Sequence, residues 1–404
     1  MKAVAIIPAR YASTRLPGKA LAQICGKAMV ERVWEIAINA KSLAAVYVAT
    51  DDIRVAAVIE KVGGNVIMTS PDCVSGTDRL IEAAKKIDAD VYVNVQGDEP
   101  LLESSAIDRL LCAFNDDKTQ VASLWREMDA EEAALPQNVK AVMDHEGKAL
   151  YFSRSPIPYA RNKNITPVYA CHLGIYAYRK KALLDFATLP PSPLEQMEQL
   201  EQLRYLQAGI PIKMLQVGPM GGGVDTAEDL QKVRQIIAAR KKEKAVQKLK
   251  ETRLLVTDVD GVLTDGGLYY GPEGEILKKF NSRDGGAIKE LQKYGVTVAI
   301  LSGRESAALQ KRAADLGISN VIMASKDKKK DMLELLKKLD IPASQTAYIG
   351  DDYPDLPAFE IAGVSIAAPR ATPAVRERAD YQVDNELQES VFAHILEIIK
   401  KGSI

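Results

Sequence analysis

The feature of this sequence that most restricts its fold is an alternation of short apolar runs with amphipathic helical patterns, which occurs twice along the chain. The first series begins with an apolar run at 4–7, a helical pattern at 29–39 and a second run at 46–49. The second series begins at 254–257 and continues through a run at 296–301. Such alternation is typical of helices packed on a largely parallel sheet. We therefore predict an α/β protein with two domains.

A charged segment separates the two series. Residues 240–251 are rich in Lys, Glu, Gln and Ala, which gives strong helix propensity but few anchors for a core. The chain of 404 residues also exceeds the length at which a single core usually keeps growing. We expect a first domain at 1–240, a solvated helical linker at 241–251 and a second domain at 252–404.

Composition excludes several classes of protein. The net charge of −1 gives no electrostatic reason to expect nucleic acid or an anionic membrane as a partner. No apolar run reaches the roughly 18 to 20 residues that span a bilayer, and the first residues lack the pattern of a secretory signal. We expect a cytoplasmic protein. The four cysteines are far apart without C-x-x-C spacing, so we expect reduced packing residues.

A basic loop follows the first apolar run. Residues 8–19, PARYASTRLPGK, place arginines, a lysine, hydroxyls and a glycine just past the carboxyl end of a predicted strand. Ligands of open α/β sheets bind at that end. Turn amides together with Arg and Lys suit a polyanion such as a triphosphate, although a basic surface loop is the alternative for an isolated cluster.

Two acidic motifs favour the ligand-binding interpretation. QGDEP at 96–100 follows the apolar run at 91–95, and GVDT lies at 223–226. A carboxylate beside a glycine at a strand end suits Mg²⁺ bound next to phosphates. The chemistry then needs no protein nucleophile: a substrate hydroxyl attacks the α-phosphate, and the metal and basic side chains stabilise the charge on departing pyrophosphate.

Seven ordered motifs in the first 235 residues resemble those of the CMP-Kdo synthetases, the 3-deoxy-manno-octulosonate (Kdo) cytidylyltransferases. The related sialic acid synthetases share the fold but open with a glycine-rich loop, so the RLPGK form favours the Kdo branch. The motifs are IIPARYASTRLPGK, SGTDRL, VNVQGDEP, YFSR, HLGIYAYR, PLEQMEQLEQLR and GVDT.

The resemblance implies CTP and Kdo as substrates and assigns roles to residues of the motifs. Asp98 and Asp225 would bind Mg²⁺, and Arg10 and Lys19 would also act in catalysis. The implied CTP-binding residues are Arg10, Arg15, Lys19, Ser75 and Gly76. The implied sugar-binding residues are Gln96, Arg154, His172, Tyr176, Glu195 and Glu198.

Three of the sugar-binding residues also admit a plain structural interpretation. A histidine such as His172 is more often a hydrogen-bonded structural residue when it stands outside a motif. Glu195 and Glu198 are three residues apart and share one face of a predicted charged helix, which is equally compatible with a solvated surface.

The second domain opens with two carboxylates at a strand end, Asp258 and Asp260. Close burial of two carboxylates is costly unless a cation shares them. This arrangement suits a phosphatase that forms an aspartyl-phosphate, with Asp258 attacking phosphorus and Asp260 protonating the leaving oxygen and later activating water. Ser302 follows the run at 296–301 and is placed to donate to the phosphoryl group.

The motifs DVDGVLTDG, FNSRDGGAI, LSGR and GDDYPDLP resemble the haloacid dehalogenase superfamily, and within it the capless Kdo 8-phosphate phosphatases. The resemblance implies Mg²⁺ at Asp258, Asp260 and Asp351, and phosphate binding by Ser302 and Lys328. It also implies a homotetramer built by a hairpin at 267–279.

One departure from that family keeps an alternative open. The family usually ends in a glycine-rich basic tail, whereas residues 380–389 here are acidic and contain no glycine. The C-terminal domain could therefore act on another sugar phosphate or serve only as an oligomerisation module. The synthetase could likewise prefer another 2-keto sugar acid, such as 8-amino-Kdo or a sialic acid.

Overall fold

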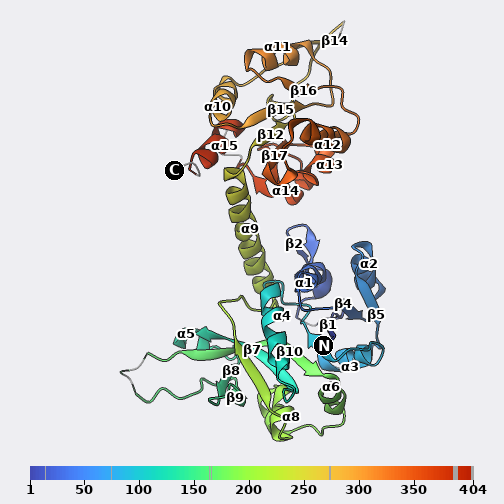
Figure 1. Cartoon of the computed structure of the whole chain (residues 1–404), viewed down its shortest axis with the longest axis vertical. Helices are drawn as coiled ribbons and strands as arrows, with labels where there is room; N and C mark the ends of the chain where they lie inside the picture. Colours follow the sequence, from blue (N-terminus) through green and yellow to red (C-terminus); the bar gives the residue numbers. More distant parts are fainter. Residues whose placement is uncertain are drawn as a thin grey trace. The chain divides into compact units, whose positions relative to one another are not determined.

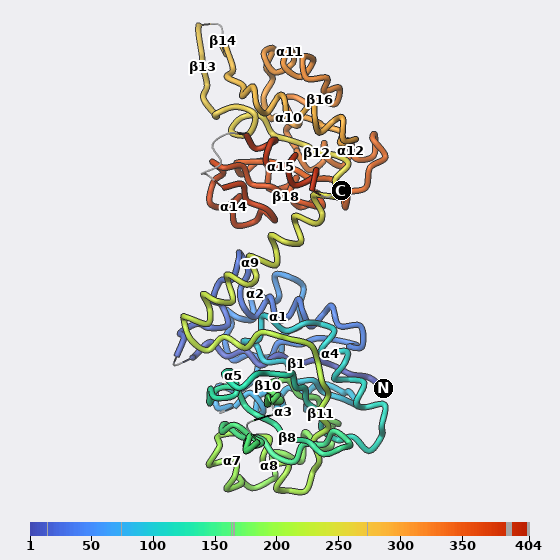
Figure 2. The backbone as a smooth tube through the Cα atoms, turned by 90° about the vertical axis from the view of Figure 1, so that its left-hand side faces the viewer, coloured from blue at the N-terminus to red at the C-terminus, as the bar shows by residue number. Residues whose placement is uncertain are grey.

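The computed structural model describes residues 1–13, 15–73, 75–162, 164, 166–272, 274–384 and 390–401. The chain forms two compact units, Met1–Arg234 and Gln235–Ile404, shown in Figures 1 and 2. Each unit is built on its own β-sheet with helices on both faces. The two-series alternation in the sequence thus corresponds to two α/β units. Within the described residues, none of the helices is long and apolar enough to cross a bilayer.

The N-terminal unit contains a mixed sheet with the strand order β11-β7-β10-β6-β1-β4-β5. β1 is parallel to β4 and β6, whereas β10 runs antiparallel to β6 and β7. Edge strands β8 and β9 pair with each other, and β8 also pairs with β10. The bounds are β1 (Ala3–Pro8), β4 (Ala45–Thr50), β5 (Asn65–Met68), β6 (Val91–Asn94), β7 (Val121–Met128), β8 (Lys140–Met143), β9 (Ala149–Ser153), β10 (Tyr169–Arg179) and β11 (Ile212–Gln216).

Apolar side chains of this sheet fill a core on each face. Ala5 and Ile7 of β1 join one core and Val4 and Ile6 the other, as the alternation of a strand requires. A small β2–β3 hairpin (Gln23–Ile24 and Lys27–Ala28) precedes the first helix. The helices are α1 (Met29–Ile38), α2 (Ile53–Lys61), α3 (Gly76–Ala84), α4 (Ser104–Leu111), α5 (Ala130–Ala134), α6 (Lys180–Phe186), α7 (Pro193–Glu198) and α8 (Gln202–Gln207).

The C-terminal unit contains a parallel sheet with the order β16-β15-β12-β17-β18-β19. Its strands are β12 (Leu254–Thr257), β15 (Thr297–Leu301), β16 (Asn320–Ile322), β17 (Thr346–Gly350), β18 (Val364–Ala367) and β19 (Tyr381–Gln382). Its helices are α10 (Ser282–Lys293), α11 (Ala307–Asp315), α12 (Lys328–Leu339), α13 (Leu356–Phe359), α14 (Pro373–Arg378) and α15 (Val391–Lys400). Strands β13 (Tyr269–Gly271) and β14 (Gly274–Leu277) form a separate hairpin, which extends away from this unit in Figure 2.

Helix α9 (Ala227–Lys250) covers most of the segment that we expected to be a solvated linker. It is helical as predicted, but Ala245 and Leu249 are buried in the core of the C-terminal unit. Leu230 and Val233, nearer its start, are also buried. Ala245 and Leu249, one turn apart, together with the half-buried Val246, therefore pack this part of α9 against the C-terminal core.

Predicted and observed elements differ mainly at their ends. The helical period of the sequence is clear at 287–293, but the corresponding helix α10 begins earlier, at Ser282. The pair Gly285-Gly286 obscured its first turns, because glycine has poor helix propensity. Asn281 caps this helix by accepting a hydrogen bond from the backbone N–H of Arg283. The acidic tail at 385–389 lies outside the described residues.

Candidate active sites

A cleft of about 240 Å³ lies at the carboxyl end of β1 and β6 in the N-terminal unit. The basic loop after β1 and the start of α3 form its walls. Ser75 caps α3 and exchanges hydrogen bonds with Asp78, which fixes the turn before the helix. All five residues that we predicted for CTP binding line this cleft, namely Arg10, Arg15, Lys19, Ser75 and Gly76.

Two carboxylates at the edge of this cleft converge on Lys19. Its Nζ lies 2.5 Å from Asp98 Oδ2 and 3.0 Å from Asp225 Oδ1. Arg15 contacts the other oxygen of Asp225 at 3.1 Å. Burial, the largest influence, disfavours the charged ammonium, but the carboxylates together outweigh it and raise the pKa of Lys19. The fold thus assembles the predicted basic and acidic groups from motifs that are far apart in sequence.

A larger cavity of about 720 Å³ adjoins the cleft. The two spaces share Arg15, Gln96, Asp98 and Asp225 in their linings. The two carboxylates therefore lie where a ligand in one space meets a ligand in the other. Of the predicted sugar-binding residues, Gln96, His172 and Tyr176 line the larger cavity.

The wall of the larger cavity contains three polar atoms that lack hydrogen-bond partners among the described residues. They are Asn94 Oδ1, Tyr176 OH and Gln202 Nε2, and each side chain is at most 9% exposed. Buried polar atoms without partners are costly. Their grouping in one cavity fits a ligand with several hydroxyl groups, which would supply the missing hydrogen bonds.

A bulge in β10 places His172 and Tyr176 together. Leu173 pairs with Leu124 and Tyr176 with Ser123, so the two residues between them have no partners on β7. As a result, the ring centroids of His172 and Tyr176 are 5.3 Å apart. Bulges often redirect side chains beside functional sites. Burial lowers the pKa of His172 to about 3, so its imidazole is neutral near pH 7.

Three other predicted sugar-binding residues take part in local structure and do not line the cavity. Glu198 accepts hydrogen bonds from Ser153 Oγ and the Arg154 N–H, and the Arg154 side chain donates back to the Glu198 carbonyl. Glu195 accepts a hydrogen bond from the Ser192 N–H in the capping box of α7 and forms an ion pair with Arg204. In the same PLEQMEQLEQLR string, Glu201 and Gln202 lie at the cavity instead.

The polar lining residues that sequence analysis missed include Asn94, Glu99, Glu201 and Gln202. Asn94 and Glu99 both lie within the quoted VNVQGDEP motif. Burial and the neighbouring Asp98 raise the pKa of Glu99 to about 8. The charged string after Pro193 indicated a helix, but α7 ends at Glu198 with Gln199 at φ 55°. This reversal, which no periodicity signals, turns Glu201 and Gln202 toward the cavity.

A buried lysine supports the same wall. Lys140 is fully buried, and its Nζ donates to the carbonyl oxygens of Leu135 (3.2 Å), Asn138 (2.6 Å) and Arg154 (2.5 Å). The segment between Leu135 and Lys140 includes part of the cavity lining. Lys140 thus ties this segment to the strand end at Arg154.

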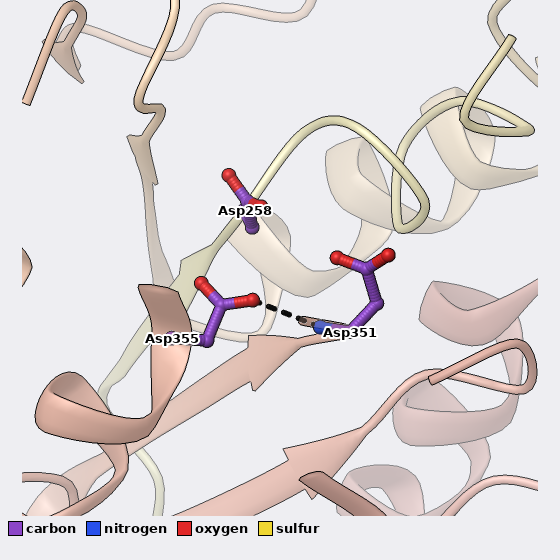
Figure 3. A group of neighbouring side chains, drawn as sticks. All are labelled: Asp258, Asp351 and Asp355. Carbon is purple, nitrogen blue, oxygen red and sulfur yellow. Dashed lines mark hydrogen bonds between the residues drawn. The ribbon is translucent and has the colours of Figure 1, made fainter. Parts of the chain in front are cut away.

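In the C-terminal unit, three of the predicted site residues follow neighbouring strands. Asp258 follows β12, Ser302 follows β15 and Asp351 follows β17, and all three strands are parallel. The side chains therefore meet at one edge of the sheet. Figure 3 shows Asp258, Asp351 and a third carboxylate, Asp355, facing one another.

One oxygen atom of each of these three carboxylates lies within 4.8 Å of an oxygen atom of each of the others. Burial, with a contribution from Asp355, raises the pKa of Asp258 to about 6 and that of Asp351 to about 7. A set of crowded carboxylate oxygens is what a hard divalent cation binds. The residues thus fit Mg²⁺ at Asp258 and Asp351, two of the three residues that the sequence suggested for this metal.

Lys328 balances part of this negative charge. Its Nζ lies 2.9 Å from Asp258 Oδ1 and 2.7 Å from Asp355 Oδ1. Asp355, which sequence analysis did not single out, is fully buried and also accepts from Tyr348 OH and the Asp351 N–H. It therefore holds Lys328 and the end of β17 in place. Asp355 lies four residues after Asp351 in the quoted GDDYPDLP motif, and this position could have identified it from the sequence.

Two further predicted residues lie beside this group. Asp260 lies outside the three-carboxylate group and pairs instead with Lys278 Nζ at 2.5 Å. Ser302 is buried, and its Oγ accepts from the backbone N–H of Arg304 at 3.2 Å. Gly261, three residues after Asp258, has φ 85°, and a Cβ there would lie 1.9 Å from Asp351 Oδ2. Only glycine permits this close approach.

The two folds and sites define the class: a nucleotidyltransferase-type unit followed by a haloacid dehalogenase-type unit. Residues 4–214, just over half of the chain, match the family model of the cytidylyltransferases, and the chain belongs to this family. Residues 277–363 match the model of the haloacid dehalogenase-like hydrolases. The protein is therefore a cytidylyltransferase that carries a hydrolase-type domain.

Comparison with individual proteins gives matches to each unit. A 3-deoxy-manno-octulosonate cytidylyltransferase from Escherichia coli is 49% identical over 245 residues, which are 60% of this chain and 99% of the relative. A solved CMP:2-keto-3-deoxy-manno-octonic acid synthetase complexed with CTP is 48% identical and covers 59% of this chain and 100% of its own, with a TM-score of 0.58. The cobalt-bound deoxy-D-mannose-octulosonate 8-phosphate phosphatase from Haemophilus influenzae is 41% identical, covers 39% of this chain and 94% of its own, and has a TM-score of 0.37.

Proposed function

We propose that the N-terminal unit transfers CMP from CTP to a hydroxyl of Kdo and releases pyrophosphate. One observation carries the proposal: a basic cleft and a polar cavity meet at Asp98 and Asp225. CTP would occupy the cleft and the sugar acid the cavity, which brings the attacking hydroxyl to the α-phosphate. The names of the E. coli relative and of the CTP-bound structure support this choice of substrates.

Different residues of this site would serve different parts of the nucleotidyl transfer reaction. Arg10, Arg15 and Lys19 would neutralise the triphosphate, and the geometry allows Lys19 to stay close to the leaving pyrophosphate. Asp98 and Asp225 would hold Mg²⁺, which when bound stabilises negative charge on phosphate oxygens. The unpaired polar atoms of the cavity would orient the sugar hydroxyls.

The C-terminal unit would hydrolyse a phosphate ester through an aspartyl-phosphate on Asp258. Asp351 and Asp258 would hold Mg²⁺. Lys328, held between Asp258 and Asp355, would offset charge on the incoming phosphate. Asp260 would protonate the leaving oxygen. Kdo 8-phosphate is the proposed substrate, because its hydrolysis would yield the sugar acid that the N-terminal unit consumes. We place both reactions in the cytoplasm, in the synthesis of lipopolysaccharide precursors.

The test is to incubate the full chain with CTP, Mg²⁺ and either Kdo or Kdo 8-phosphate, while following pyrophosphate, free phosphate and CMP-sugar together. CMP-Kdo from both substrates, with free phosphate from the second only, would establish both activities. If CMP-sugar formed from 8-amino-Kdo or a sialic acid with a higher kcat/KM than from Kdo, that acid would replace Kdo as the proposed substrate. Product from free Kdo alone would refute Kdo 8-phosphate hydrolysis and favour the assembly role described next.

A role for the C-terminal unit in assembly rests on a separate observation. The segment 268–277 carries exposed apolar side chains, including Tyr270 at 62% and Ile276 at 65%. A cluster of this kind is typical of an interface between protein chains. We propose that the β13–β14 hairpin joins four copies of the chain.

Replacing Ile276 with Lys is expected to convert the tetramer to smaller species, because a charge would be buried at each interface. Sedimentation velocity of the full chain measures the mass directly. The matched control is Leu333→Lys on α12, where the side chain is 49% exposed but lies outside the hairpin. A wild-type protein that sediments as a monomer, or an unchanged mass for the Ile276 variant, would contradict the proposal.

A further inference from the structure

Ser123 on β7 lies opposite the bulge of β10 and is fully buried. Its Oγ has three polar neighbours within hydrogen-bond distance: the Ile175 carbonyl oxygen at 2.8 Å, the Leu173 carbonyl oxygen at 3.2 Å and Nε2 of His172 at 3.1 Å. The Leu173 carbonyl group immediately precedes the bulge and the Ile175 carbonyl group lies within it, where β7 supplies no regular ladder partner. A single hydroxyl group therefore lies within hydrogen-bond distance of both the irregular part of the strand and the adjacent imidazole.

The number of available protons decides which of these groups donates. A serine hydroxyl carries one proton and accepts through its lone pairs, whereas carbonyl oxygens only accept. If the hydroxyl donated to Nε2, Oγ would face both carbonyl oxygens with no proton between them, which is unfavourable in a buried position. The hydroxyl proton therefore goes to a carbonyl oxygen. Nε2 must then carry its own hydrogen and donate it to Oγ.

This assignment determines what the rest of the imidazole can do. A neutral imidazole with hydrogen on Nε2 has a lone pair on Nδ1 and can accept a hydrogen bond there. Nδ1 of His172 has no hydrogen-bond partner in the part of the chain that the structure describes. The ring lines the larger cavity between Phe152 and Tyr176, with centroid distances of 5.0 and 5.3 Å. Nδ1 is thus the polar atom that the histidine offers to a ligand.

We propose that Ser123 is a positioning residue that holds His172 as the Nε2–H tautomer, so that Nδ1 accepts a hydrogen bond from a sugar-acid hydroxyl. The identity of the ligand rests on the proposed function, whereas the tautomer does not. The cavity would then present a hydrogen-bond acceptor at His172 and, at Tyr176, a hydroxyl group that can either donate or accept. Such a pair selects a ligand that donates at the first position, which a hydroxyl does and a carboxylate does not.

Nuclear magnetic resonance of the wild-type protein tests the tautomer without any substrate. The chain has three histidines, so ¹⁵N labelling of histidine gives few signals, and His172→Gln identifies the relevant one. Long-range ¹H–¹⁵N spectra near pH 7 are expected to show a protonated Nε2 and an unprotonated Nδ1 for His172. Addition of Kdo is expected to shift the Nδ1 signal upfield, as acceptance of a hydrogen bond does. A protonated Nδ1 in the free protein would overturn the proposal.

Steady-state kinetics of Ser123→Ala tests the positioning role. We expect KM for the sugar acid to rise about threefold to tenfold, the value of one hydrogen bond, with KM for CTP unchanged. The imidazole signals should move toward the averaged shifts of mixed tautomers. Ser123→Thr, which keeps the hydroxyl, should restore both readouts. Unchanged shifts and KM in Ser123→Ala would refute the role. A chain that activates no sugar acid would refute the proposed function instead, and the wild-type tautomer measurement would remain decisive.

Discussion

Replacing Asp258 with Asn is expected to lower phosphate ester hydrolysis at least about a thousandfold, because the amide cannot form the aspartyl-phosphate. The same change removes one ligand of the three-carboxylate group and the partner of Lys328 at 2.9 Å. Cytidylyl transfer from CTP to Kdo should stay at the wild-type rate, because its residues belong to the other unit. Free phosphate and pyrophosphate release, measured on the same sample, give both rates.

The second reaction of the chain is the internal control for folding, and Asp315→Asn is the matched external one. Asp315 lies on α11, exposed and away from the carboxylate group, so its replacement should leave both rates unchanged. Hydrolysis retained in Asp258→Asn would exclude Asp258 as the nucleophile. A wild-type chain without hydrolysis of Kdo 8-phosphate or of simple phosphate esters would leave assembly as the role of the unit.

The sequence predicted most strands and helices because their side-chain period is local. The runs at 4–7 and 254–257 became β1 and β12 with at most one residue of difference at each end. Ligand groups at the carboxyl ends of these strands could likewise be placed together in advance, since parallel strands end at a common edge. The convergence of Lys19 with Asp98 and Asp225 follows from this rule, although 79 and 206 residues separate them.

The lining of the larger cavity depends on departures from regular structure. The bulge between Leu173 and Tyr176 and the reversal at Gln199 set which side chains face the cavity. Neither departure has a periodic signal, so Gln202 was missed, and Glu198 was predicted to bind sugar where the structure shows it bound to Ser153 and Arg154. The buried Asp355 was missed for a related reason: its role depends on Lys328, 27 residues away.

Asp98→Asn is expected to lower kcat for cytidylyl transfer by about a hundredfold to a thousandfold, the usual effect of losing one group that stabilises transition-state charge. Asp98 lies where the cleft meets the larger cavity and contacts Lys19 at 2.5 Å. With one carboxylate gone, Arg10, Arg15 and Lys19 would still attract CTP, so KM for CTP should change much less than kcat.

Pyrophosphate release at saturating CTP and Kdo, repeated over a range of Mg²⁺ concentrations, measures this effect. The Mg²⁺ concentration that gives half of the maximal rate should rise in Asp98→Asn, because only Asp225 would remain as a protein ligand. The control is Asp88→Asn, which removes an exposed ion pair with Lys180 and should change neither parameter. Unaltered hydrolysis by the C-terminal unit would show that the chain is folded. If Asp98→Asn lost affinity for CTP while kcat and the Mg²⁺ requirement stayed the same, Asp98 would act only by holding Lys19, and the cation would need another site.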